Sequence, residues 1–167
     1  DPFSSYLLGE CYKKGRGLEI NYKKAYKLFY AGHLKGHIAS SFSLAKCFYD
    51  GIGIKKSNKK SLEIFKELDE EVNNHFDSAF YLGYMHLCGE GTNENDKLAF
   101  KYFKKYSISE SAKSYLWLGR CYYYGWGIKQ NKKKGIEILE KSSNQIENNE
   151  NFYQRLAKEV LGEIFYE

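Results

Sequence analysis

Small and apolar residues recur along the chain with the period of an α-helix. Around Gly119, a serine, a leucine and an aromatic ring stand at offsets −5, −1 and +3. These offsets fall on one arc of a helix with 3.6 residues per turn. The same arrangement surrounds Gly9, Ala45 and Gly83, with a histidine as the ring in the third case. Four amphipathic helices are therefore predicted, one in each repeat, and each is called helix A here. The small residue of helix A allows another helix to pack closely against it.

A Gly-x-Gly sequence follows each helix A, as in CYYYGWGIKQN at 121–131. Glycine adopts the positive φ that ends a helix and reverses the chain. Neither the G-x-G-x-x-G nor the G-x-x-x-x-G-K-[ST] spacing of a phosphate-binding loop occurs. Turns between helices are predicted instead, at residues 15–17, 51–53, 89–91 and 125–127.

A second helix, helix B, is predicted after each turn. It begins at an N-cap type of residue, Asn21, Ser57, Asn95 or Asn131, which is followed by a small residue and an apolar pair. The first glycines of the turns are 36, 38 and 36 residues apart, at 15, 51, 89 and 125. A period in the mid-thirties with two helices per unit is typical of a solenoid.

The predicted fold is therefore all-α, a single domain over residues 1–167. Four helix pairs are expected at 1–38, 39–76, 77–111 and 112–150. The final LAKEVLGEIFYE restarts the pattern, so 152–167 is expected to be a partial repeat or a capping helix. Since the chain begins without Met and stops within a repeat, we expect it to be a fragment of a longer protein.

The pattern Leu-Gly-x-x-Tyr-x-x-Gly-x-Gly-Ile, followed by a cap and a small residue, resembles the Sel1-like repeat, a relative of the tetratricopeptide repeat. The departures are local: Ala45, His86, Thr92 and a longer 142–151 linker. The resemblance implies an α-solenoid of antiparallel helix pairs. It also implies roles such as adaptors in membrane-associated and ER-associated degradation complexes, activators of other enzymes, or bacterial host-interaction proteins.

Composition narrows the classes of function. The net charge of +5 is mild and the lysines are interspersed with acids, which is weak support for nucleic-acid binding. No apolar run reaches about 18 residues, so no direct membrane insertion is expected. Cys11, Cys47 and Cys121 occupy equivalent helices about 9–10 Å apart, too far for a disulfide. Buried thiols in a reducing, cytoplasmic compartment are predicted, with the ER lumen or secretion left open; Cys88 is expected to be exposed.

Candidate chemistry is sparse. No Ser/His/Asp or Cys/His set stands outside the repeat positions. His33 and His37 flank Gly36 in a linker without a third ligand, and His86 fills a core ring position. We therefore expect a protein that is no enzyme, with no metal, cofactor or small-molecule substrate.

A partner surface is predicted on the side of helix A opposite its buried arc, at offsets −2, +1, +4 and +5. In related solenoids this stripe lines the concave surface. Its N-terminal half is charged, whereas its C-terminal half is aromatic with one arginine, the residue types enriched in interaction hot spots. The alternative is that the rings only stack between adjacent helices. The predicted contact residues are Lys46, Tyr49, Tyr81, Tyr84, Leu87, Trp117, Arg120, Tyr123 and Tyr124.

The sequence thus favours a non-catalytic scaffold or adaptor that binds a protein or peptide. Two alternatives remain open. One is a basic, aromatic groove that binds nucleic acid, with lysines such as Lys55, Lys56 and Lys132–Lys134 at the starts of helix B. The other is a regulatory subunit that activates a partner enzyme.

Overall fold

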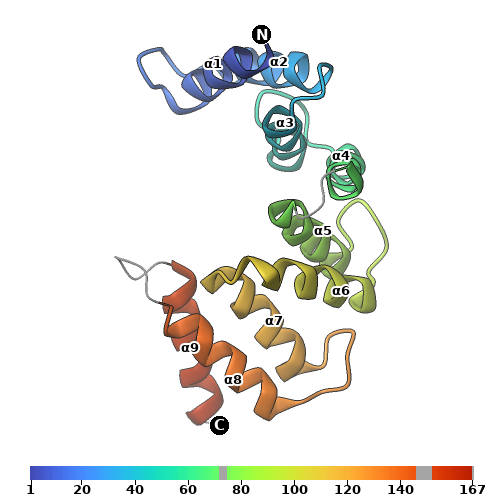
Figure 1. Cartoon of the computed structure of the whole chain (residues 1–167), viewed down its shortest axis with the longest axis vertical. Coiled ribbons are helices and arrows are strands. Elements are labelled where there is room, and N and C mark those ends of the chain that lie inside the picture. Colours follow the sequence, from blue (N-terminus) through green and yellow to red (C-terminus); the bar gives the residue numbers. More distant parts are fainter. Residues whose placement is uncertain (72–74, 146–151, 167) are drawn as a thin grey trace. The chain divides into compact units, whose positions relative to one another are not determined.

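The computed structural model describes residues 1–71, 75–145 and 152–166, and these residues form helices and turns with no strand (Figure 1). The chain divides into two compact units, residues 1–78 with 90–93 and residues 79–89 with 94–167. The elements are α1 (Pro2–Lys14), α2 (Tyr22–His33), α3 (Ile38–Asp50), α4 (Asn58–Glu71), α5 (Phe76–Cys88), α6 (Asp96–Tyr106), the 3₁₀ turn η1 (Ser107–Ser109), α7 (Ala112–Tyr124), α8 (Lys132–Ser143) and α9 (Phe152–Tyr166).

Helices A and B alternate as predicted. Helix A corresponds to α1, α3, α5, α7 and α9, and helix B to α2, α4, α6 and α8. Within the first unit α1 packs on α2 and α3 on α4, and within the second unit α7 packs on α8 and α8 on α9. The prediction of an all-α chain of helix pairs is confirmed.

The turns have the local chemistry that the sequence predicts. In all four, both glycines have positive φ, between 67° and 80°. Asn21, Asn95 and Asn131 each accept a hydrogen bond at Oδ1 from the backbone N–H three residues later, at 2.9–3.0 Å. Ser57 accepts the equivalent bond at 3.4 Å. These caps satisfy one of the free N–H groups at the start of each helix B.

The small residues of helix A let helix B approach. A Cβ added to Gly9 would lie 2.6 Å from the Phe29 ring, and one added to Gly83 would lie 2.8 Å from the Phe103 ring. Both distances are shorter than van der Waals contact. In the second pair, where Ala45 stands at this position, the buried Ser61 hydroxyl donates a hydrogen bond of 2.9 Å to its carbonyl oxygen.

The second glycine of a turn contacts the preceding helix pair. A Cβ on Gly53 would overlap the carbonyl of Tyr22, and a Cβ on Gly127 would overlap that of Asp96. A Cβ on Gly91 would lie 2.6 Å from the backbone carbon of Asn58. Each contact reaches the start of the preceding helix B, so within each unit Gly53 and Gly127 set how closely two consecutive pairs pack. Gly17, in the first pair, has no atom within 4 Å of its Cβ position.

Histidine provides two helix caps that the sequence analysis missed. The Nδ1 atoms of His37 and His75 accept hydrogen bonds from the backbone N–H groups of Ser40 and Ser78, at 3.3 and 3.2 Å. They also lie 2.8 and 2.7 Å from the hydroxyls of the same serines. The serine at offset −5 is therefore part of the cap at the start of helix A.

Candidate interaction site

Seven of the nine predicted contact residues belong to the second unit, and Lys46 and Tyr49 belong to the first. In the second unit the rings form one continuous aromatic cluster around α5, α6 and α7. Phe80, Tyr84, Leu87, Trp117 and Trp126 pack against a core of Ala99, Phe103 and Cys121. Most of the predicted stripe is thus half-buried, because rings of neighbouring helices cover one another.

Arg120 lies between two indole rings. Its guanidinium carbon is 5.3 Å from the centre of the Trp117 ring and 5.4 Å from that of Trp126, within the range of cation–π contacts. Trp117 stacks on Phe103 at 5.2 Å, and Trp126 stacks on Tyr124 at 5.2 Å. We call Trp117, Arg120, Tyr124 and Trp126 the Arg120 cluster. Trp126 was not predicted, because its place between two turn glycines suggested only a loop residue.

Two hydrogen-bond donors in this cluster are buried without an acceptor. Within the part of the chain that the structure describes, Nε of Arg120 and Nε1 of Trp117 have no hydrogen-bond partner. A buried donor that lacks its partner costs about 1–3 kcal/mol. Nε belongs to the Arg120 guanidinium itself, and both donors are covered by protein atoms, so the rings that hold the arginine also shield these two N–H groups.

Three other predicted contact residues of the second unit lie outside the Arg120 cluster. Tyr84 meets Trp117 edge to face at 5.4 Å. Tyr81 lies against Phe80, with ring centres 5.2 Å apart. Tyr123 is buried, because α8 approaches α7 so closely that a Cβ on Gly135 would lie 2.7 Å from the Tyr123 backbone nitrogen. Tyr123 therefore packs between α7 and α8 and is not part of an exposed stripe.

In the first unit the predicted stripe is charged, and three of its side chains form ion pairs with one another. Glu10 pairs with Lys13 at 3.5 Å and with Lys14. Burial raises the pKa of Glu10, but the hydrogen bond and charge of Lys14 and the charge of Lys13 outweigh it, so the pKa is lowered overall. Tyr49 lies under the ammonium of Lys56, 5.4 Å from its ring centre. Glu10 thus offsets part of the positive charge of the two lysines.

Lys113 occupies an aromatic cage that the sequence did not predict. Its ammonium is 3.2 Å from the ring centre of Phe80 and 5.4 Å from that of Tyr153, with Tyr81 and Tyr106 at 5.8 and 6.0 Å. The four rings come from α5, α6 and α9. This contact joins the first residues of α7 to α9, in addition to the apolar core that α9 shares with α7 and α8.

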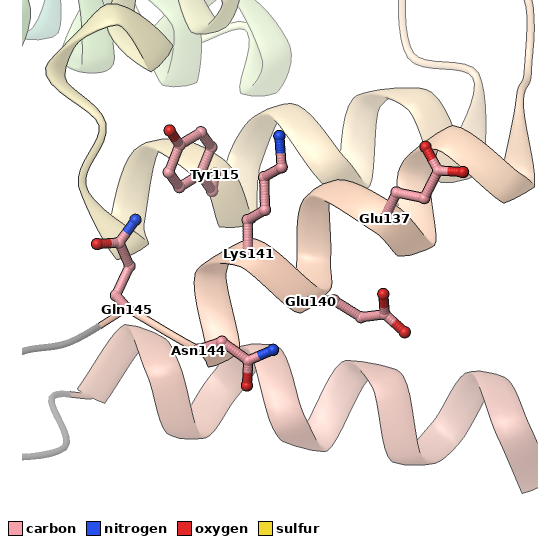
Figure 2. Close-up of a pocket in the computed structure, with 6 residues that line it drawn as sticks. All are labelled: Tyr115, Glu137, Glu140, Lys141, Asn144 and Gln145. Carbon is pink, nitrogen blue, oxygen red and sulfur yellow. The ribbon is translucent and has the colours of Figure 1, made fainter.

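The surface also contains a broad polar hollow of about 670 Å³ along α7 and α8 (Figure 2). Tyr115, Glu137, Glu140, Lys141, Asn144 and Gln145 line it. Figure 2 shows that the carboxylates of Glu137 and Glu140 point to different sides and do not converge. An acid–base pair requires groups that reach one reacting atom, so this arrangement offers no catalytic pair.

The cysteines differ in exposure. Cys47 and Cys121 are buried free thiols, as predicted, and burial raises their pKa values to about 11 and about 12. Cys11 is also a free thiol, but it is half-buried, whereas a buried thiol was predicted. Among the described residues, no helix pair precedes α1 and covers this cysteine. Cys88 is exposed, as predicted.

We expect Cys88 to be alkylated first, and Cys47 and Cys121 only on unfolding. At pH 8 a thiol with a pKa of about 11 is ionised in about one molecule in a thousand, and the thiolate is the reactive form. Cys11 should react at an intermediate rate. Iodoacetamide labelling followed by peptide mapping measures this order, and labelling of Cys121 as fast as Cys88 would contradict it.

Comparison with known proteins agrees with this architecture. The family model of the Sel1 repeat matches residues 2–32, 38–67, 76–105 and 112–145, which together make up most of the chain. The chain therefore belongs to the Sel1 repeat family, and the predicted α-solenoid class is confirmed. Proteins of this family are in general protein-interaction scaffolds and are typically non-catalytic.

Two solved structures share the fold. One is a protective antigen present in uropathogenic Escherichia coli strains, which displays an SLR fold, with a TM-score of 0.82 and 24% identity over 98% of this chain. The other is a Sel1 repeat protein from Oxalobacter formigenes, with a TM-score of 0.74 and 24% identity over 86% of this chain. The chain spans 33% and 58% of their lengths. No curated protein matches the chain.

The described residues contain neither a metal-binding group nor a membrane-spanning helix. Over residues 1–71, 75–145 and 152–166, no three His, Cys, Asp or Glu side chains come together as a metal ion would require. In the same ranges, every helix is too short or too polar to cross a membrane.

Proposed function

We propose that this chain is a non-catalytic scaffold that binds a partner protein, and that the Arg120 cluster is the main contact point. The observation that carries the proposal is the Arg120 guanidinium held against the rings of Trp117 and Trp126. The partner segment is proposed to present a carboxylate, from Asp, Glu or a chain terminus, to this arginine.

The physical case rests on preorganisation. A free arginine side chain loses about 2 kcal/mol of rotamer entropy when it is fixed, whereas Arg120 is already restrained by two rings. A planar guanidinium binds a carboxylate through two parallel hydrogen bonds. Arg120 forms no ion pair within the described part of the chain, so its charge is available to a partner. Tyr124, exposed beside it, adds apolar contact area.

The test is capture of partners by the full chain from the cells in which it occurs, with quantitative mass spectrometry. The variant is Arg120→Ala with Tyr124→Ala. A matched control is Arg16→Ala with Tyr30→Ala, because Tyr30 and Tyr124 are both 44% exposed and each stacks on one neighbouring ring.

We expect the Arg120 variant to lose a partner that the wild type and the control retain. Loss of an interface hot spot costs about 2 kcal/mol or more, which is about a thirtyfold loss of affinity. Equal capture by all three proteins would exclude the Arg120 cluster as the contact point. If the captured partner is an enzyme, its activity with and without the chain tests the regulatory-subunit alternative.

A second candidate function, binding of nucleic acid, is favoured by a basic hollow in the first unit. Its volume is about 340 Å³, and Lys55, Lys56 and Lys60 line it beside Tyr26 and Phe48. Titration with single-stranded RNA and with duplex at low and physiological salt separates the two candidates. Tight binding at physiological salt would favour the nucleic-acid function, whereas binding only at low salt would reflect non-specific attraction.

A further inference from the structure

The residues that line the basic hollow of the first unit have equivalents in the second unit, two repeats later. The hollow is lined in part by Tyr26, Phe48, Lys55, Lys56 and Lys60. At the equivalent positions the second unit has Phe100, Tyr122, Lys129, Gln130 and Lys134. The ring pair meets edge to face in both units, with ring centres 5.9 Å apart in the first and 5.5 Å apart in the second. The two sets therefore occupy the same place in the repeat and can be compared residue by residue.

In the second unit, the polar side chains at these positions are used by the fold itself. The Lys134 ammonium donates a hydrogen bond of 3.1 Å to the hydroxyl of Tyr122 and lies 4.2 Å from its ring centre. Nε2 of Gln130 donates to the backbone oxygen of Tyr123 at 2.8 Å. Both side chains are thus held by partners within the same unit.

The first unit differs at two of these positions, and both differences leave donors available. Phe48 has no hydroxyl, so Lys60 keeps a ring contact of 5.4 Å but has no acceptor there for its N–H groups. Lys56 stands in place of the glutamine. Among the described residues, the ammonium groups of Lys55, Lys56 and Lys60 form neither a hydrogen bond nor an ion pair. Three exposed cations therefore border one hollow with their donors free for a ligand.

We propose that this hollow binds the terminal phosphate of one nucleotide, either free or at the end of a strand. A terminal phosphate carries a charge of about −1.5 to −2 at neutral pH and three acceptor oxygens, which three ammonium groups match better than they match the single charge of an internal phosphodiester. The volume of about 340 Å³ is at the small end of ligand pockets, so it suits one nucleotide and not a continuous strand. The inference deepens the second candidate function, on which it rests, and is independent of the Arg120 cluster.

The use of lysine favours a nucleotide over a phosphorylated peptide. Domains that recognise phosphopeptides use arginine clusters, because the planar guanidinium binds phosphate through two parallel hydrogen bonds. Lysine binds phosphate as a point charge, as it does in loops that hold nucleotide phosphates. Among the described residues, no arginine lines the hollow. The half-buried ring of Tyr26 beside the lysines offers contact to a base.

The test compares adenosine 5′-monophosphate with adenosine by isothermal titration calorimetry on the full chain. We expect saturable binding of the monophosphate that weakens as salt rises, because the lysines are exposed and their charges are screened. Adenosine, which lacks the phosphate, should bind at least about tenfold more weakly. Equal binding of the two compounds, or no saturable binding of the monophosphate, would overturn the proposal. Phosphotyrosine that binds as tightly as the monophosphate would also overturn it.

The protein variant is Lys55→Gln with Lys60→Gln, and its matched control is Lys129→Gln with Lys134→Gln. Both remove two positive charges at equivalent positions of the repeat. We expect the first variant to bind the monophosphate at least about tenfold more weakly and the control to bind it like the wild type. Equal affinity of the two variants would contradict a site in this hollow.

A second variant, Phe48→Tyr with Lys56→Gln, gives the first unit the side chains of the second. We expect it to keep the melting temperature of the wild type, because the same residues pack at the equivalent positions, and to lose affinity for the monophosphate because Lys60 gains the hydroxyl as a partner. Unchanged affinity in this variant would count against the proposal.

Single-stranded RNA with a 5′-phosphate or a 5′-hydroxyl separates this inference from the nucleic-acid function. Tighter binding of the phosphorylated strand is the expected result. Equal binding of the two strands, weakened in both cases by Lys55→Gln with Lys60→Gln, would support nucleic-acid binding but overturn the terminal-phosphate site. Absence of binding by both strands and by the monophosphate would reject both proposals.

Discussion

Gly127→Ala should destabilise the second unit by about 3 kcal/mol or more, the largest effect that we expect from adding one methyl group to this chain. Two costs combine. The backbone of Gly127 has φ of 67°, which an alanine adopts only with strain. The new Cβ would also overlap the carbonyl of Asp96, a backbone group that cannot rotate away. The first residues of α6 must therefore move to accommodate the alanine.

Gly17→Ala is the matched control for this change. Gly17 has nearly the same backbone conformation, with φ of 71°, but open space around its Cβ position. Because only the backbone strain applies, we expect the free energy of unfolding to fall by about 1 kcal/mol. Urea unfolding followed by circular dichroism measures both variants. Equal losses for the two would show that the close contact between consecutive pairs contributes nothing to stability.

Trp117→Ala should cost about 3 kcal/mol of unfolding free energy, whereas Arg120→Ala should cost about 1 kcal/mol or less. Trp117 stacks on the fully buried Phe103, so its removal leaves a cavity in the aromatic cluster. Arg120 contributes cation–π contacts but also a buried donor without an acceptor, and its removal relieves that cost.

The contrast between these two variants separates stability from binding within one cluster. Urea unfolding of each single variant gives the stability of the fold, and partner capture gives the binding. A large stability loss in Arg120→Ala would mean that the arginine is a structural residue of the second unit, and the proposed contact point would then lose its main support.

The repeat, its turns and its caps could be predicted from the sequence because each depends on local chemistry. A sharp turn after a helix requires positive φ, which the two glycines of Gly-x-Gly adopt without strain. An asparagine before a helix accepts hydrogen bonds from the first N–H groups, wherever the segment lies. His37 and His75 were missed as caps because histidine is an uncommon N-cap residue. The recurring serine three residues after each was the signal that could have revealed them.

The candidate site was less predictable because it depends on contacts between helices. A helical wheel places Trp117 and Tyr123 on the side away from helix B when each helix is considered alone. The structure buries Tyr123 because Gly135 lets α8 approach, and it half-buries Trp117 under the rings of α5 and α6. Trp126 joins Arg120 only through the course of the turn, which no helical period describes.

The glycine contact between consecutive pairs has a consequence for how such a chain changes its length in evolution. Gly53, Gly91 and Gly127 each fit the start of the helix B one repeat earlier. A duplicated repeat therefore carries both parts of this contact. Its second turn glycine fits against the helix B of the repeat before it, and the start of its own helix B receives the glycine of the repeat after it. Gain or loss of whole repeats leaves every junction complete. Insertion of a single residue between the glycine and its helix displaces the contact, so length variation should occur in units of one repeat or in the linkers between pairs.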